Sequence, residues 1–213
     1  MKTPLLIRKS AVLILTISLS FLYACSDDNT NNSDDLKDET TELTLKETDK
    51  EALLFMLEEE KLARDTYTYL NDLWSVNQFS NIKNSEQTHM NSVENLLIKN
   101  NIEYAILPAG KFKNQMLQNY YNQFAQDGAL SKAIAFQIGA TIEDLDIKDL
   151  KDYLDITTHP ELIAVFKNLQ CGSRNHLRSF VIGFENTGNT YTPQFITQDE
   201  YNNIVESSHE KCN

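Results

Sequence analysis

Six acidic and histidine residues stand on four helical patterns, at positions where a side chain facing a protein interior is expected. A carboxylate in an apolar core is costly unless it is paired or bound to a cation. Four carboxylates and two histidines distributed over four helices therefore predict a metal site. The predicted ligands are Glu60, Glu86, His89, Glu143, Asp146 and His176.

The pair Glu86 and His89 gives the strongest local signal. The two residues are three positions apart, so both side chains can reach one point beside a helix. Carboxylates and Glu-x-x-His pairs that face a bundle interior are how di-iron and di-manganese carboxylate proteins build their sites. Imidazole nitrogen with carboxylate oxygen suits iron, while manganese and zinc remain alternatives.

Helical patterns dominate the part of the chain that must position these residues. Glycine and proline are scarce and alternation of strand type is rare, so the predicted class is all-α. Two capping boxes mark helix starts, with Thr48 and Thr158 as the predicted N-caps. Helices are expected at about 49–74, 80–99, 113–126, 131–154, 159–184 and 198–205. The helix at 131–154 is expected to have a break near 146–149.

Residues 1–24 have the pattern of an export signal. Three basic residues precede an apolar run, 11–22, which is too short for an ordinary membrane-spanning helix. The run ends in LYAC, which resembles a bacterial lipobox and predicts lipidation of Cys25; an ordinary signal peptide with Cys25 incidental is the alternative. Ser26 follows this cysteine, so outer-membrane or cell-surface attachment by lipid is favoured over retention at the inner membrane.

The residues after the lipobox divide into a tether and one domain. Residues 25–46 are acidic, polar and nearly free of apolar residues, as in a disordered tether. Residues 47–207 form the predicted domain, and 208–213 are the C-terminal end. The whole chain carries a formal net charge of −12, and loss of the basic leader makes it more negative. Nucleic acid is therefore an unsuitable partner.

Cys171 and Cys212 leave two alternatives open. An exported protein meets an oxidising compartment, in which a disulfide between them would persist. Two free thiols are the other interpretation.

Five segments carry a specific resemblance. The first, EKLARDTY at 60–67, resembles the first ligand helix of rubrerythrin-type ferritin-like proteins, and EQTH at 86–89 matches their second-helix pair. The others are GATIEDLD at 139–146, GSRNHLR at 172–178 and YTPQFI at 191–196. Over residues 46–207 the chain resembles the DUF2202 family of ferritin-like domains. The resemblance implies a ferritin-like four-helix bundle, with an additional short helix in the long connection and a C-terminal tail packed on the bundle.

The resemblance also implies a role for each predicted ligand. Glu86 would bridge two metals, while His89 and His176 would each bind one of them. Glu60 and Glu143 would supply further carboxylates, with Asp146 as an additional ligand. Four residues would contact the ligands and orient them: Arg64, Tyr67, Ser173 and Arg178. Simple packing or ion pairing is the alternative for Arg64, Tyr67 and Arg178.

One position departs from the pattern. Ser173 stands where a glutamate is expected, three residues before His176. Compensation by Asp146, a site for a single metal, and weak binding are three alternatives.

The individual ligands also have other interpretations. Glu60 could pair with Arg64 or Arg174, His176 could be a core histidine, and Asp146 could end a helix. Other residues of the same types are expected to be solvent-exposed: Glu58, Glu59, His159 and His209.

The function expected from these features is a metal-binding lipoprotein. Iron, as one or two ions, with oxidase or peroxide-handling chemistry is the leading hypothesis, and no catalytic residue is assigned. The chain has no Cys-x-x-Cys pair for a second redox centre, so electrons would come from an external donor. A non-catalytic, surface-anchored metal-binding or interaction scaffold is the alternative, and a homodimer remains open.

Overall fold

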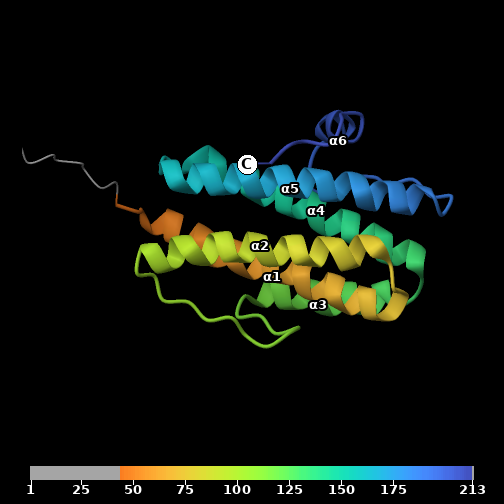
Figure 1. Ribbon diagram of the computed structural model, residues 1–213, viewed down its shortest axis with the longest axis horizontal. Helices are drawn as coiled ribbons and strands as arrows, with labels where there is room; N and C mark the ends of the chain where they lie inside the picture. Colours follow the sequence, from red (N-terminus) through yellow and green to blue (C-terminus); the bar gives the residue numbers. More distant parts are fainter. Residues whose placement is uncertain (1–43, 213) are drawn as a thin grey trace, which may run out of the picture. The chain divides into compact units, whose positions relative to one another are not determined.

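Six helices make up the secondary structure of the described residues, 44–212, and no strand occurs among them. The computed structural model therefore confirms the all-α class (Figure 1). The helices are α1 (Glu47–Trp74), α2 (Asn77–Lys99), α3 (Gln115–Gly128), α4 (Lys132–Ile156), α5 (Pro160–Glu185) and α6 (Gln198–Val205).

Four of these helices form a closed bundle. Helix α1 packs against α2 and α4, and α5 packs against the same two helices from the other side. Helix α3 lies in the long connection between α2 and α4 and packs on α1 and α4, whereas α6 packs on α5 (Figure 1). Each bundle helix therefore has two neighbours and directs one side toward a shared interior.

The bundle interior consists of two apolar clusters. One contains Tyr67, Phe79 and Phe180, and the other contains Met56 and Phe166. Burial of such side chains is the main favourable contribution to folding. Along each bundle helix the predicted ligands fall between residues of the two clusters, so they form a polar layer within an otherwise apolar core.

The N-terminal ends of α1 and α5 differ from the sequence prediction. Neither Thr48 nor Thr158 is an N-cap; Lys46 and His159 hold these positions. Asp49 is buried, and its carboxylate accepts hydrogen bonds from the backbone N–H of Lys46 at 3.0 Å and from Thr157 Oγ1 at 2.7 Å. One buried carboxylate thus joins the starts of two helices that are distant in sequence.

The predicted helix bounds hold within a few residues elsewhere. Helix α2 begins at Asn77 instead of residue 80, and α6 spans the predicted residues. The predicted break at 146–149 was wrong, because α4 continues through it. Asp146 is buried and Asp149 is partly buried, so these acids belong to the inner face of the helix and do not interrupt it.

A buried lysine fixes the connection that precedes α3. Lys61 is 1% exposed, and its Nζ donates to Asp65 Oδ2 at 2.5 Å and to the carbonyls of Pro108 and Lys111 at 3.1 and 3.0 Å. The ammonium also lies 4.2 Å from the centre of the Phe112 ring. A buried ammonium needs such partners, and these partners hold the connection against α1.

The predicted leader, the lipidation at Cys25 and most of the tether lie outside the described residues. Within residues 44–212, none of the helices combines the length and the hydropathy that crossing a membrane requires.

Candidate metal centre

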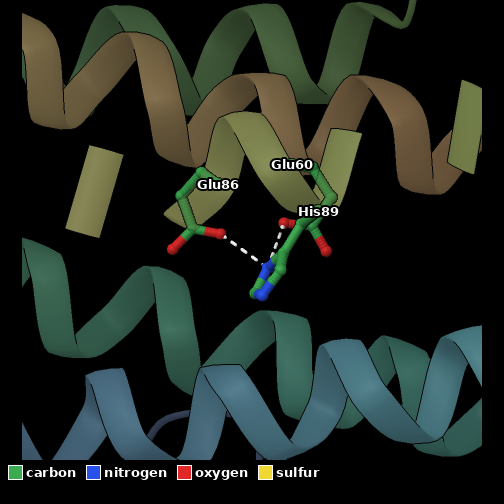
Figure 2. A group of neighbouring side chains, drawn as sticks. All are labelled: Glu60, Glu86 and His89. Carbon is green, nitrogen blue, oxygen red and sulfur yellow. Dashed lines mark hydrogen bonds and ion pairs between the residues drawn. The ribbon is translucent and has the colours of Figure 1, made fainter. Parts of the chain in front are cut away.

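Glu86 and His89, one turn apart on α2, meet Glu60 from α1. His89 Nδ1 lies 2.9 Å from Glu86 Oε2 and 3.1 Å from Glu60 Oε2, so both carboxylates point at the same ring nitrogen (Figure 2). One ligand atom from each of the three residues lies within 4.8 Å of the others. Each of the three residues is buried.

A second group shares Glu86. The other oxygen of this carboxylate, Oε1, lies 2.8 Å from His176 Nδ1 on α5, and Glu143 Oε2 on α4 lies 3.5 Å from the same nitrogen. These three residues also gather ligand atoms within 4.8 Å of one another. Glu86 thus presents one oxygen to each histidine, and the two imidazole rings stack with centroids 5.6 Å apart.

The carboxylates and histidines of the two groups strongly perturb one another's pKa values. Burial and the charge of Asp146 raise the pKa of Glu60, and burial followed by Glu86 raises the pKa of Glu143. Burial acts upward on the pKa of Glu86 as well, but His176 and His89 outweigh it and lower that pKa. Although burial opposes the change, Glu86 and Glu143 raise the pKa of His176 to about 10. These shifts favour protons on part of the cluster, and a cation bound here would displace them.

Asp146 and Ser173 lie beside these groups. The Ser173 hydroxyl hydrogen-bonds Asp146 Oδ2 and lies 2.9 Å from the Leu169 carbonyl oxygen. Asp146 Oδ1 is buried without a hydrogen-bond partner among the described residues, and burial raises the pKa of Asp146 to about 8. Ser173 therefore holds a carboxylate from α4 near the point from which a glutamate at position 173 would have projected.

Tyr67 holds the carboxylate of Glu143. Its ring is fully buried, and its hydroxyl donates to Glu143 Oε1 at 2.6 Å. This leaves Glu143 Oε2 directed at His176.

Replacement of Tyr67 by phenylalanine is expected to lower the free energy of unfolding of the metal-free protein by about 1–3 kcal/mol, because it leaves a buried oxygen of Glu143 without its donor. Urea unfolding followed by circular dichroism measures this change. The same substitution at Tyr120, a partly buried tyrosine of α3, is the control. Equal unfolding midpoints for Tyr67→Phe and wild type would show that the hydrogen bond contributes nothing.

Two glycines make room for rings inside the bundle. A Cβ at Gly172 would lie 2.6 Å from His89 Cε1 and Nε2, and a Cβ at Gly139 would lie 2.6 Å from the Phe180 ring. Such distances are too short for unbonded atoms. Glycine at position 139 thus leaves room for the Phe180 ring, and Gly172 gives His89 the space for its orientation.

Of the two interpretations of Arg64 and Arg178, their hydrogen bonds and ion pairs agree with packing and ion pairing. Arg64 donates to Asp65 and Gln87. Arg178 donates to the Ile204 carbonyl, and its Nη2 lies 2.8 Å from Glu210 Oε1. Both arginines thus join other segments: Arg64 joins α1 to α2 through Gln87, and Arg178 joins α5 to the C-terminal segment.

Three residues expected to be solvent-exposed are not. Glu59 is 1% exposed and His159 is 8% exposed, whereas His209 is exposed as expected. Glu58 accepts hydrogen bonds from the backbone N–H groups of Lys113 and Asn114. Spacing could have revealed Glu59, because it lies three residues after buried Met56 and four before buried Ala63.

A disulfide joins Cys171 on α5 to Cys212 in the C-terminal segment. Arg174 reinforces this connection, because its guanidinium donates to both carboxylate oxygens of Glu210. The free thiols considered from the sequence are therefore not what the structure contains. The C-terminal segment is fixed to α5 beside the residues that precede His176.

Comparisons with known proteins agree with this architecture. The family model of the uncharacterized protein domain DUF2202 matches residues 49–208. The uncharacterized protein MJ0754 of Methanocaldococcus jannaschii is 44% identical over 169 residues, which cover 78% of this chain and 91% of that protein. A crystal structure of hypothetical protein MJ0754 aligns with a TM-score of 0.77 and covers 78% of this chain and 96% of the other. With this extent of match, the chain belongs to the DUF2202 family.

Proposed function

We propose that this protein binds two metal ions in a ferritin-like site between α1, α2, α4 and α5, and that the metal is iron. The observation that carries the proposal is the position of Glu86, whose two oxygens each face a different histidine. A carboxylate placed in this way can bridge two cations. Glu60 with His89, and Glu143 with His176, then complete one set of ligands on each side.

The chemistry of the donor set fits such ions. Imidazole nitrogen and carboxylate oxygen suit iron, manganese and zinc. Buried oxygens of Glu60 and Asp146 have no hydrogen-bond partner in the described part of the chain, which is costly unless something else satisfies them. Cations between the helices would satisfy both oxygens.

Bound iron would supply redox chemistry toward oxygen or peroxide, which is the reaction class proposed here. The residues of the chain would hold and orient the ligands: Tyr67 fixes Glu143, and Ser173 fixes Asp146. Electrons would come from an external donor. We further propose that a lipid on Cys25 attaches the domain to the cell envelope.

A second candidate function is metal binding without turnover, as a surface-anchored scaffold. Ser173 favours it, because a serine stands where the di-iron pattern has a carboxylate. A site with fewer anionic ligands stabilises two oxidised metal ions less, because their positive charge is less fully balanced.

Aerobic addition of Fe(II) to the purified protein is expected to give a bound-iron chromophore, and Glu86→Ala combined with His89→Ala is expected to abolish it, because the bridging and imidazole ligands are lost. Bound iron is measured by elemental analysis after gel filtration. The chain offers a matched control in Glu206 and His209, which have the same Glu-x-x-His spacing but are exposed.

Equal iron content in wild type and in the Glu86→Ala/His89→Ala variant would refute the proposal. Tight iron binding without consumption of peroxide would favour the scaffold. Absence of bound metal in wild type under all conditions would make the cluster a structural polar network.

A further inference from the structure

Glu59, next to the ligand Glu60 on α1, is buried without a use in the proposed centre. It is 1% exposed, and its side-chain hydrogen-bond partner is the carboxyl group of Asp149 on α4. Burial raises the pKa of Glu59, and the next causes are the negative charges of Asp146 and Asp149. A carboxylate in such surroundings is costly, so the structure must gain something from it.

The register of α1 against α4 shows what Glu59 faces. The rings of Phe55 and Tyr153 are in contact, with centroids 6.0 Å apart, and Tyr67 contacts Glu143 further along both helices. The two helices are thus antiparallel here. Glu59 lies one turn after Phe55, and Asp149 lies one turn before Tyr153, so their carboxylates lie opposite each other. Asp146 is one turn further inward on α4.

Tyr153 connects this carboxylate pair to the surface. Together with Phe55 it lines a pocket of about 440 Å³ between α1 and the connection that leads to α3. Burial raises the pKa of Tyr153 to about 12, and the next cause is the charge of Glu59. Glu51, Glu58 and Glu103 also line the pocket, together with the basic residue Lys113, so acidic groups exceed basic ones in its lining. Glu59 thus lies close enough to act on Tyr153 at this pocket, and Asp146 lies close enough to act on Glu59 from the side of the candidate metal centre.

We propose that Glu59 and Asp149 form a transit site through which divalent cations pass from this pocket to the metal centre. The inference rests on the proposed function, since a route needs a destination. Glu59 and Asp149 belong to neither of the two tight ligand groups found among the described residues. A site of two carboxylates suits transit, because it must bind a cation strongly enough to admit it and weakly enough to release it.

Transfer from this pair inward requires a next ligand. Asp146 provides one, because its Oδ1 is buried without a hydrogen-bond partner in the described part of the chain and its Oδ2 is held by Ser173. After burial, the charge of Asp146 contributes most to raising the pKa of Glu60, so the two carboxylates lie close together. Asp146 thus joins the transit site to the first ligand group, which gives this residue a role besides that of a permanent ligand.

Co(II) loading of the full domain tests the route, because Co(II) in oxygen and nitrogen sites absorbs visible light and does not react with oxygen under these conditions. Stopped-flow absorbance gives the loading rate, and equilibrium dialysis gives the number of ions bound. Glu59→Gln and, separately, Asp149→Asn are expected to slow loading by roughly tenfold or more, since carboxylates that concentrate a cation act mainly on the rate of binding. The number of ions bound at equilibrium should stay that of wild type.

Asp155→Asn is the matched control, because Asp155 is an exposed acid near the end of the same helix, and its loading rate should equal that of wild type. Circular dichroism checks the fold of each variant, and the partly buried Asp149 provides a second test if Glu59→Gln does not fold. Unchanged loading rates in both variants, with wild-type binding intact, would overturn the transit site and leave a proton shared by Glu59 and Asp149; the proposed function would stand. Failure of the wild type to bind Co(II) would overturn both.

Discussion

Replacement of Glu86 by glutamine is expected to abolish binding of both metal ions, whereas Glu60→Gln and Glu143→Gln should each abolish binding of one. The difference follows from geometry, because Glu86 belongs to both ligand groups and each of the other two carboxylates belongs to one. Glutamine keeps the volume of the side chain and removes the anionic oxygens that cations require. Loss of one of three protein ligands from a buried site is a large effect, since no water-exposed group can replace it.

Isothermal titration with Fe(II) under anaerobic conditions, or with Co(II), measures the number of ions bound. Glu94→Gln on the same helix is the control, because the Glu94 carboxylate accepts a hydrogen bond from Tyr104 at 3.0 Å and belongs to neither ligand group. Two ions bound by Glu86→Gln would contradict the bridging role. Equal losses in all three variants would show that the two sites fill only together.

Removal of the disulfide is expected to have the largest effect on stability. Cys171 and Cys212 are 41 residues apart in sequence, and closing a loop of this length is worth about 4 kcal/mol in the chain-entropy description. For a domain of this size the loss should lower Tm by roughly 8 °C or more. Differential scanning calorimetry of the Cys171→Ser/Cys212→Ser variant measures both quantities.

Reductant supplies the control for this experiment. Dithiothreitol should lower the Tm of wild type toward that of the double variant and leave the variant unchanged. A wild-type Tm that does not respond to complete reduction would show that Arg174, Arg178 and their contacts with Glu210 suffice to hold the C-terminal segment.

The helices illustrate how far periodicity determines the fold. Apolar residues at helical spacing predict the number of helices and their bounds within a few residues, because each helix must bury one side. The start of α1 is different: its N-cap depends on Asp49, whose second partner, Thr157, is 108 residues away. The predicted break in α4 failed for a related reason. Asp146 and Asp149 read locally as helix-ending acids, but tertiary contacts make them inward-facing residues of a continuous helix.

The candidate site shows the same division. Spacing and residue type identify Glu60, Glu86, His89, Glu143 and His176, and the structure brings all five together. Spacing does not reveal which neighbouring side chains contact these five residues. Arg64 and Tyr67 are both near Glu60 in sequence, yet Tyr67 contacts Glu143 and Arg64 contacts Asp65 and Gln87. A helix shows which side a residue occupies, but the neighbouring helix determines what it meets.

The sequence by itself determined the all-α class, the four helices that bear the candidate ligands and the types of these side chains, because helical periodicity and the cost of burying a carboxylate are local properties. Tertiary structure alone decided three further features. It turned the two oxygens of Glu86 toward different histidines, placed Asp146 against Ser173, and set Glu59 opposite Asp149. Each of these features depends on the register between two helices, which arises from the packing of the entire bundle and is encoded in no single segment.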